Sequence, residues 1–102
     1  MVAGTGKTIY ETILSLDLDN NPVTGATFDI YVYKDGNEFS GVTPSISLID
    51  GVRGVYSLSW SSDTIGEYQL YIKNNNTSII FVSDNVSIKS DSDISTDFYI
   101  GL

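Results

Sequence analysis

The chain has 102 residues, of which 13 are acidic, 5 are basic and none is His or Cys, and its formal net charge is -8. This length fits one domain. The lack of His and Cys excludes disulfide scaffolds, Cys- or His-based metal sites and catalysis by imidazole or thiolate, so we expect no cofactor and no enzymatic activity. The acidic balance argues against binding of nucleic acid, whose phosphates require clustered Lys and Arg.

The residue types favour strands over helices. Seven Tyr, four Phe and one Trp accompany abundant Ser, Thr, Ile and Val, and most Gly and Pro fall between apolar runs, where turns would lie. No apolar run approaches the roughly 20 residues that cross a bilayer, and the first residues lack the pattern of a secretory signal. We therefore expect an all-β domain that makes no membrane contact.

The first predicted strand covers residues 10–18, where apolar and polar side chains alternate. The more apolar set contains Leu14 and Leu16, which we expect in the core, and the other set, which contains Glu11, is expected to face solvent. A turn at residues 19–22 ends this strand, because Asn tolerates left-handed geometry and Pro cannot donate to a strand ladder.

Side chains near this turn have part of the spacing of a calcium loop. Asp17, Asp19 and Asn21 stand at positions i, i+2 and i+4, but Pro22 occupies the position that requires Gly, and Phe28 the position that requires a bidentate Glu. We therefore expect no bound metal. The three residues remain an incomplete match beside the simpler interpretation, which is a solvated turn.

A second strand is predicted over residues 26–33, with the same alternation. Phe28 and Ile30 belong to its apolar set and are expected in the core. The strand is expected to end at the Asp-Gly pair of residues 35–36, because this dipeptide is a strong turn signal.

Five further strands are expected in the rest of the chain. They are a short strand at 46–48, two clearly alternating strands at 56–60 and 67–72, a continuous apolar run at 79–82 whose facing is ambiguous, and a last strand at 86–88. The alternating pair supplies the remaining residues that we expect in the core, namely Tyr56, Leu58, Trp60, Tyr68 and Leu70. About seven strands at this spacing are typical of a β-sandwich.

The predicted organisation has three parts. Residues 1–7 are a flexible lead-in, residues 8–89 form the sandwich, and residues 90–102 are an acidic spacer followed by an apolar arm or extra strand. An apolar terminus is unusual and needs a place to be buried. Two alternatives carry equal weight: this end completes the domain's own sheet, or it binds the sheet edge or groove of a neighbour. The partner-binding candidates in it are Phe98, Tyr99, Ile100 and Leu102.

Three tyrosines are expected on the outward faces of their strands. Tyr31 and Tyr33 share one face of the second predicted strand, and Tyr71 lies opposite the core residues of a later strand. Exposed aromatic platforms stack on sugars and anchor protein interfaces. The alternative is that these tyrosines are ordinary cross-strand residues of a solvated sheet.

Two stretches of the chain resemble bacterial and phage immunoglobulin-like domains. Residues 17–25, Asp-Leu-Asp-Asn-Asn-Pro-Val-Thr-Gly, are similar to the D-x-x-G-N-P-V-x-G junction of those domains, with Asn20 in place of Gly. Residues 54–60 and 65–70 are similar to their G-x-Y-x-x-x-[YW] and x-G-x-Y-x-[VL] strands. The resemblance implies an immunoglobulin-like antiparallel sandwich in which the ring of Tyr68 lies in the core and its hydroxyl binds nearby backbone.

For a single domain without a secretion signal, the resemblance implies a structural interaction module of a tailed-phage virion. Its role there would be capsid decoration, a head fibre or a neck or tail accessory, and it would be assembled in the host cytoplasm. The expected partners are other virion proteins or further copies of the chain. Two alternatives remain open: a carbohydrate-binding module that takes a surface glycan on its tyrosines, and an adhesin-type repeat of the bacterial cell surface.

Overall fold

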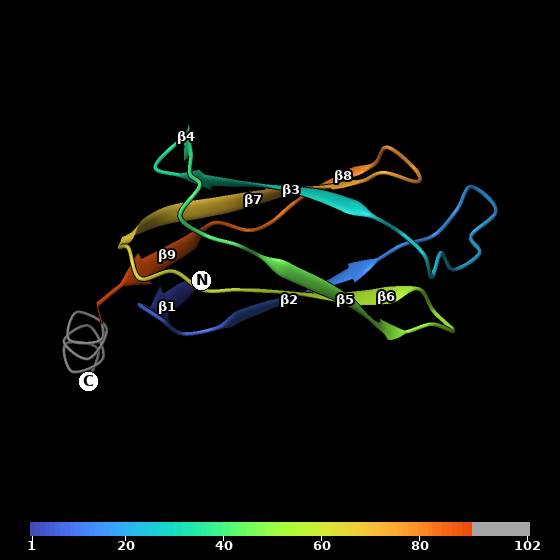
Figure 1. Ribbon diagram of the computed structural model, residues 1–102, viewed down its shortest axis with the longest axis horizontal. Coiled ribbons are helices and arrows are strands. Elements are labelled where there is room, and N and C mark those ends of the chain that lie inside the picture. Colours follow the sequence, from blue (N-terminus) through green and yellow to red (C-terminus); the bar gives the residue numbers. More distant parts are fainter. Residues whose placement is uncertain (91–102) are drawn as a thin grey trace.

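The computed structural model describes residues 1–90, which form two β-sheets packed face to face (Figure 1). The larger sheet has the order β1-β9-β7-β3-β4, with β8 also paired to β7, and the smaller sheet has the order β2-β6-β5. The strands of the larger sheet are β1 (Val2–Gly4), β3 (Phe28–Lys34), β4 (Asn37–Glu38), β7 (Gly66–Asn74), β8 (Ile80–Val82) and β9 (Val86–Lys89). Those of the smaller sheet are β2 (Ile9–Leu14), β5 (Ser45–Asp50) and β6 (Val55–Trp60).

The core lies between the two sheets and is built on the two strands with the clearest alternation. Every second residue of β6 and β7 is buried, as predicted for Tyr56, Leu58, Trp60, Tyr68 and Leu70. Phe28 and Ile30 of β3 are partly buried and pack against this core. The other buried apolar residues of the core are Ile9, Ile13, Val32, Val42, Ile72, Val86 and Ile88.

The predicted facing of the first strand is wrong. Leu14 is 58 % exposed, and Leu16 lies after the end of β2 and is only half-buried, whereas Ile9 and Ile13 are buried. The cause is the pairing with β6, in which Ile13 lies opposite Tyr56 and so points to the same side of the sheet. This register also turns Glu11 toward the core side.

The expectation of a flexible lead-in at residues 1–7 is also wrong for its first half. Residues Val2–Gly4 form β1, which pairs in parallel with Ser87–Lys89 of β9, whereas the other strand pairs within residues 1–90 are antiparallel. The backbone of Met1 accepts a hydrogen bond from the Ser87 N–H over 2.9 Å and so extends the pairing. Strand β1 and the two-residue β4 are the two strands that the structure has beyond the seven predicted from the sequence.

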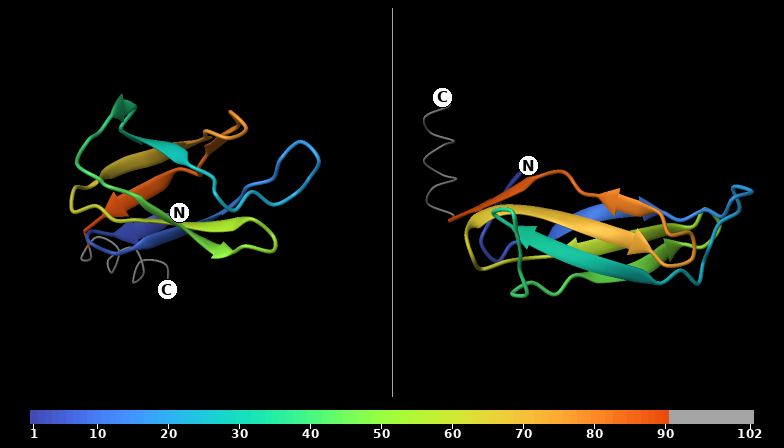
Figure 2. Two further views of the ribbon diagram at one scale, coloured as in Figure 1. Left: turned by 45° about the vertical axis from the view of Figure 1, so that its right-hand side comes forward. Right: turned by 90° about the horizontal axis from the view of Figure 1, so that it is seen from above.

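The strands β8 and β9 follow one another along the same side of β7 (Figure 2). They are separated at Ser83, which is buried and binds the backbone of Leu70 twice: its N–H donates to the Leu70 carbonyl, and its Oγ accepts from the Leu70 N–H, both over 2.9 Å. Within residues 1–90, no helix is long and apolar enough to cross a membrane.

Candidate functional site

The outer face of the larger sheet brings the three predicted tyrosines together. Tyr31 of β3 lies directly opposite Tyr71 of β7, and opposite residues of an antiparallel pair project from the same face. The ring of Tyr33 packs on that of Tyr71 with 5.0 Å between ring centres and 54° between planes. Tyr31 and Tyr71 remain about two-fifths exposed, at 43 % and 38 %. The sequence alternation therefore predicted the facing of these rings correctly.

Two aliphatic residues of β8 extend this aromatic surface. Val82 lies opposite Tyr71 and Ile80 lies opposite Lys73, so both project from the outer face, where they are 43 % and 56 % exposed. We call the five apolar side chains of this face the tyrosine patch; they are Tyr31, Tyr33, Tyr71, Ile80 and Val82. A shallow concavity of about 280 Å³ in this patch is lined by the three tyrosines, Ile80 and Lys73.

A second apolar feature lies at the edge of the sandwich, between β2 of one sheet and β8 of the other. Phe81 lies opposite the buried Ile72 and therefore points toward the space between the sheets, yet it is 42 % exposed. It lines two cavities, one of about 240 Å³ and one of about 430 Å³. We call this pair of cavities the edge groove; its lining includes Tyr10, Glu11, Ile13, Phe28, Phe81 and Asp84.

The edge groove carries two carboxylates. Partial burial, reinforced by the negative charge of Asp84, raises the pKa of Glu11 above its ordinary value. The sequence pattern placed Glu11 on the solvent face, and nothing in the local alternation brings it together with Asp84, which lies more than 70 residues later. Their proximity follows from the pairing of β2 with β6 and of β9 with β7.

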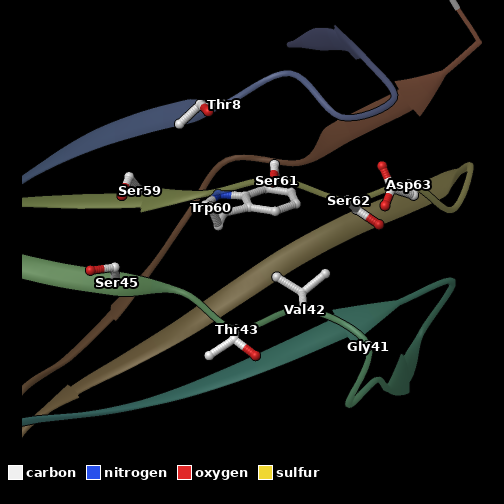
Figure 3. Close-up of a pocket in the computed structure, with 10 residues that line it drawn as sticks. All are labelled: Thr8, Gly41, Val42, Thr43, Ser45, Ser59, Trp60, Ser61, Ser62 and Asp63. Atoms are coloured by element: carbon white, nitrogen blue, oxygen red, sulfur yellow. The ribbon is translucent and has the colours of Figure 1, made fainter.

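A third concavity, of about 390 Å³, lies at one end of the smaller sheet (Figure 3). Figure 3 shows hydroxyl side chains gathered there from Thr8 before β2, Ser45 on β5 and Ser59 on β6. Trp60 and Asp63 also line this concavity. The Nε1 of Trp60 is buried and has no hydrogen-bond partner among residues 1–90. The surface is therefore a hydroxyl-lined hollow with one carboxylate.

The residues of the incomplete calcium-loop match, 17–21, form a closed turn. Oδ1 of Asp17 accepts the N–H groups of Asp19 and Asn21, over 2.9 Å and 2.8 Å, so this carboxylate oxygen is used by backbone. Asn20, between them, has a positive φ of 63°, which Asn tolerates. Among residues 1–90, no three acidic side chains are grouped closely enough to hold a metal ion.

The predicted partner-binding residues, Phe98, Tyr99, Ile100 and Leu102, lie outside the described residues. The residues that sequence reasoning missed are Ile80, Phe81 and Val82, which supply both the tyrosine patch and the edge groove. Their signal was the continuous apolar run itself, because such a run places apolar side chains on both faces of a strand.

Comparison with known proteins supports the architecture. No family model matches the chain, and no curated protein matches its sequence. The crystal structure of the Lin-41 filamin domain is similar to this chain, with a TM-score of 0.63 over 86 % of this chain and 82 % of that one, at 18 % sequence identity. So low an identity supports the fold alone. With its two packed sheets of strands, the chain is an all-β, immunoglobulin-like sandwich.

Proposed function

We propose that this chain is a non-enzymatic protein-interaction module that docks through the tyrosine patch. The observation that carries the proposal is the convergence of three tyrosines and Ile80 in one concavity on a sheet face that is otherwise open to solvent. Tyr is enriched in protein interfaces because its ring buries a large apolar area while its hydroxyl still finds a polar partner.

The geometry of the patch favours a partner that makes a few strong contacts with it. The Tyr33 and Tyr71 rings already pack on each other, so little side-chain freedom remains to be lost when a partner covers them. Lys73 beside them offers a charged donor at the rim. Residues of this kind at the centre of an interface typically cost about 2 kcal/mol or more when truncated, which corresponds to roughly a 30-fold loss of affinity.

The finer proposal is that the partner is another protein of a tailed-phage virion, on a capsid or tail surface. Its support is the similarity of residues 17–25, 54–60 and 65–70 to bacterial and phage immunoglobulin-like domains. If the proposal is right, the coding sequence lies among capsid, portal or tail genes, and the chain is found in particles. Particles that lack the chain would overturn the virion role.

The test of the docking face is incorporation into those particles. A Tyr31→Ala, Tyr71→Ala double variant is expected to stay in the free fraction of a density gradient, while the wild-type chain sediments with the particles. Ile65→Ala is the matched control, because Ile65 is 59 % exposed in a loop away from the patch. Incorporation of the tyrosine variant at the wild-type level would exclude the patch as the docking face.

The second candidate function is carbohydrate binding at the same patch. It is favoured by the concave arrangement of the three tyrosine rings with Lys73, since aromatic faces stack on sugar rings and a charged donor can bind their hydroxyls. A glycan array probed with the wild-type chain and with Tyr31→Ala tests this candidate. Absence of wild-type binding to every glycan would remove it.

A further inference from the structure

We propose that the edge groove binds residues Phe98–Leu102 of a second copy of this chain, which add a strand beside β8 and place apolar side chains between the two sheets. This inference concerns the edge of β8, which adjoins the tyrosine patch through Ile80 and Val82, and it does not depend on the proposed function. It assigns residues 98–102 of another copy to the open edge, and it predicts that the chain self-associates.

The first argument is the state of the β8 edge. Within residues 1–90, β8 pairs with β7 alone, so the other side of its backbone is unpaired. Exposed edges are normally protected by charge, Pro or a bulge. Here the edge is apolar and uncharged: Ile80 is 56 % exposed, Phe81 42 % and Val82 43 %. An edge of this composition favours the addition of another strand.

The second argument is the space behind that edge. The two cavities that share Phe81 lie between β2 and β8, where no strand formed by residues 1–90 closes the gap. A strand added beside β8 would present every second side chain to this gap. Residues 98–102 have the required pattern, with Phe98, Ile100 and Leu102 in one alternating set. None of their side chains is charged, so they bring no like charge to Glu11 and Asp84.

The third argument is the length of the segment that joins Ser90 to Phe98. This length favours binding of residues 98–102 from a second copy over binding of the same residues from the same chain. Ile88 pairs with Gly66 and Val82 pairs with Tyr71, so Ser90 and Val82 are separated by about seven residue steps along β7, or about 24 Å. The eight residue steps from Ser90 to Phe98 span at most about 29 Å when fully extended. An unrestrained chain of that length has an end-to-end distance of only about 15 Å.

The path of the chain's own end is also obstructed. The position beside β9 is filled by β1, whose Val2–Gly4 pair with Ser87–Lys89. Residues 91–97 of the same chain would have to pass outside β1 in a largely extended form, which makes the effective concentration of residues 98–102 at the groove low. A second copy can bring residues 98–102 to the groove without this restraint.

Sedimentation velocity on the full chain, over a range of concentrations, tests the proposal. We expect dimers or larger species that dissociate on dilution. The Phe98→Asp, Ile100→Asp double variant is expected to be monomeric throughout, because its new charges would face Glu11 and Asp84. Ser95→Asp, Thr96→Asp is the matched control: it adds the same charge within the spacer and should associate like the wild type. Association of the Phe98→Asp, Ile100→Asp variant at the wild-type level would overturn the proposal.

Hydrogen exchange of the β8 amides identifies the groove as the binding surface. In the monomeric variant the β8 amides that point away from β7 should exchange quickly, and a synthetic peptide of residues 94–102 should protect them. Phe81→Asp in the same background should abolish that protection, with the exchange of β6 amides reporting that the sandwich is still folded. A wild-type chain that is monomeric at every concentration overturns the proposal. In that case, protected β8 amides would indicate that the groove binds residues 98–102 of the same chain. Unprotected β8 amides would indicate that the groove is empty.

Discussion

The hydroxyl of Tyr68 donates a hydrogen bond to the carbonyl oxygen of Thr64, four residues earlier, over 2.7 Å. The same hydroxyl lies 2.8 Å from Oγ of Ser62, and the ring is fully buried beside that of Trp60. The resemblance to immunoglobulin-like domains implied this tyrosine corner, and the structure confirms it. The contact fastens the loop that precedes β7 to the core of the sandwich.

Tyr68→Phe is expected to lower the free energy of unfolding by about 1–2 kcal/mol. The substitution keeps the buried ring but leaves the Thr64 carbonyl and the Ser62 hydroxyl without their shared partner. Urea denaturation measures the effect. Tyr10→Phe is the control, since Tyr10 is 70 % exposed. Equal stability of Tyr68→Phe and wild type would contradict a stabilising role for the corner.

The sequence predicted best those strands in which only one of the two alternating sets is apolar. In β6 the inward Tyr56, Leu58 and Trp60 alternate with Ser, so one face alone could enter the core. In β2 both sets contain apolar residues, Ile9 and Ile13 in one and Tyr10 and Leu14 in the other, and the set with Leu14 faces out. Only the pairing of β2 with β6 decides between them, and that pairing is a long-range property that local alternation does not contain.

The candidate site was predictable in part for the same reason. Alternation placed Tyr31, Tyr33 and Tyr71 on the outer face, but it could not align Ile80 and Val82 with them. That alignment depends on the register of β8 on β7, which is fixed by the double hydrogen bond between Ser83 and Leu70. The edge groove was beyond prediction, because it is formed by strands of different sheets.

Gly54→Ala is expected to destabilise the fold by more than the roughly 1–2 kcal/mol that left-handed backbone costs a non-Gly residue. Gly54 has a φ of +70°, and an added Cβ would also meet the Ser15 carbonyl oxygen and the backbone of Pro22. Gly36→Ala isolates the conformational cost, since Gly36 has a φ of +85° but no neighbour within 4 Å of an added Cβ. Thermal unfolding compares the two variants, and equal losses would exclude the steric contribution at Gly54.

Glu67→Gln is expected to destabilise the fold at pH 7 and to have little effect near pH 2. Hydrogen bonds from the Ser87 hydroxyl and the Asn85 side-chain amide hold the pKa of Glu67 below its ordinary value. The ionised carboxylate therefore stabilises the folded state above the unfolded pKa of about 4.3, and this contribution is lost as the pH falls through the lower folded pKa. Urea denaturation at several pH values measures the difference, and a pH-independent difference would contradict this account.

Glu11→Gln is expected to have the opposite effect, because burial and the charge of Asp84 raise the pKa of Glu11. The folded state then binds the Glu11 proton more tightly than the unfolded state, so wild-type stability falls as the pH rises from about 4.3 through the raised folded pKa. The variant lacks this penalty and should be more stable than wild type at pH 7, with the advantage disappearing below about pH 4. Glu38→Gln is the control, since it removes one negative charge at an exposed position of β4. A Glu11→Gln variant that is less stable than wild type at pH 7 would mean that the ionised carboxylate makes a favourable contact in the folded state.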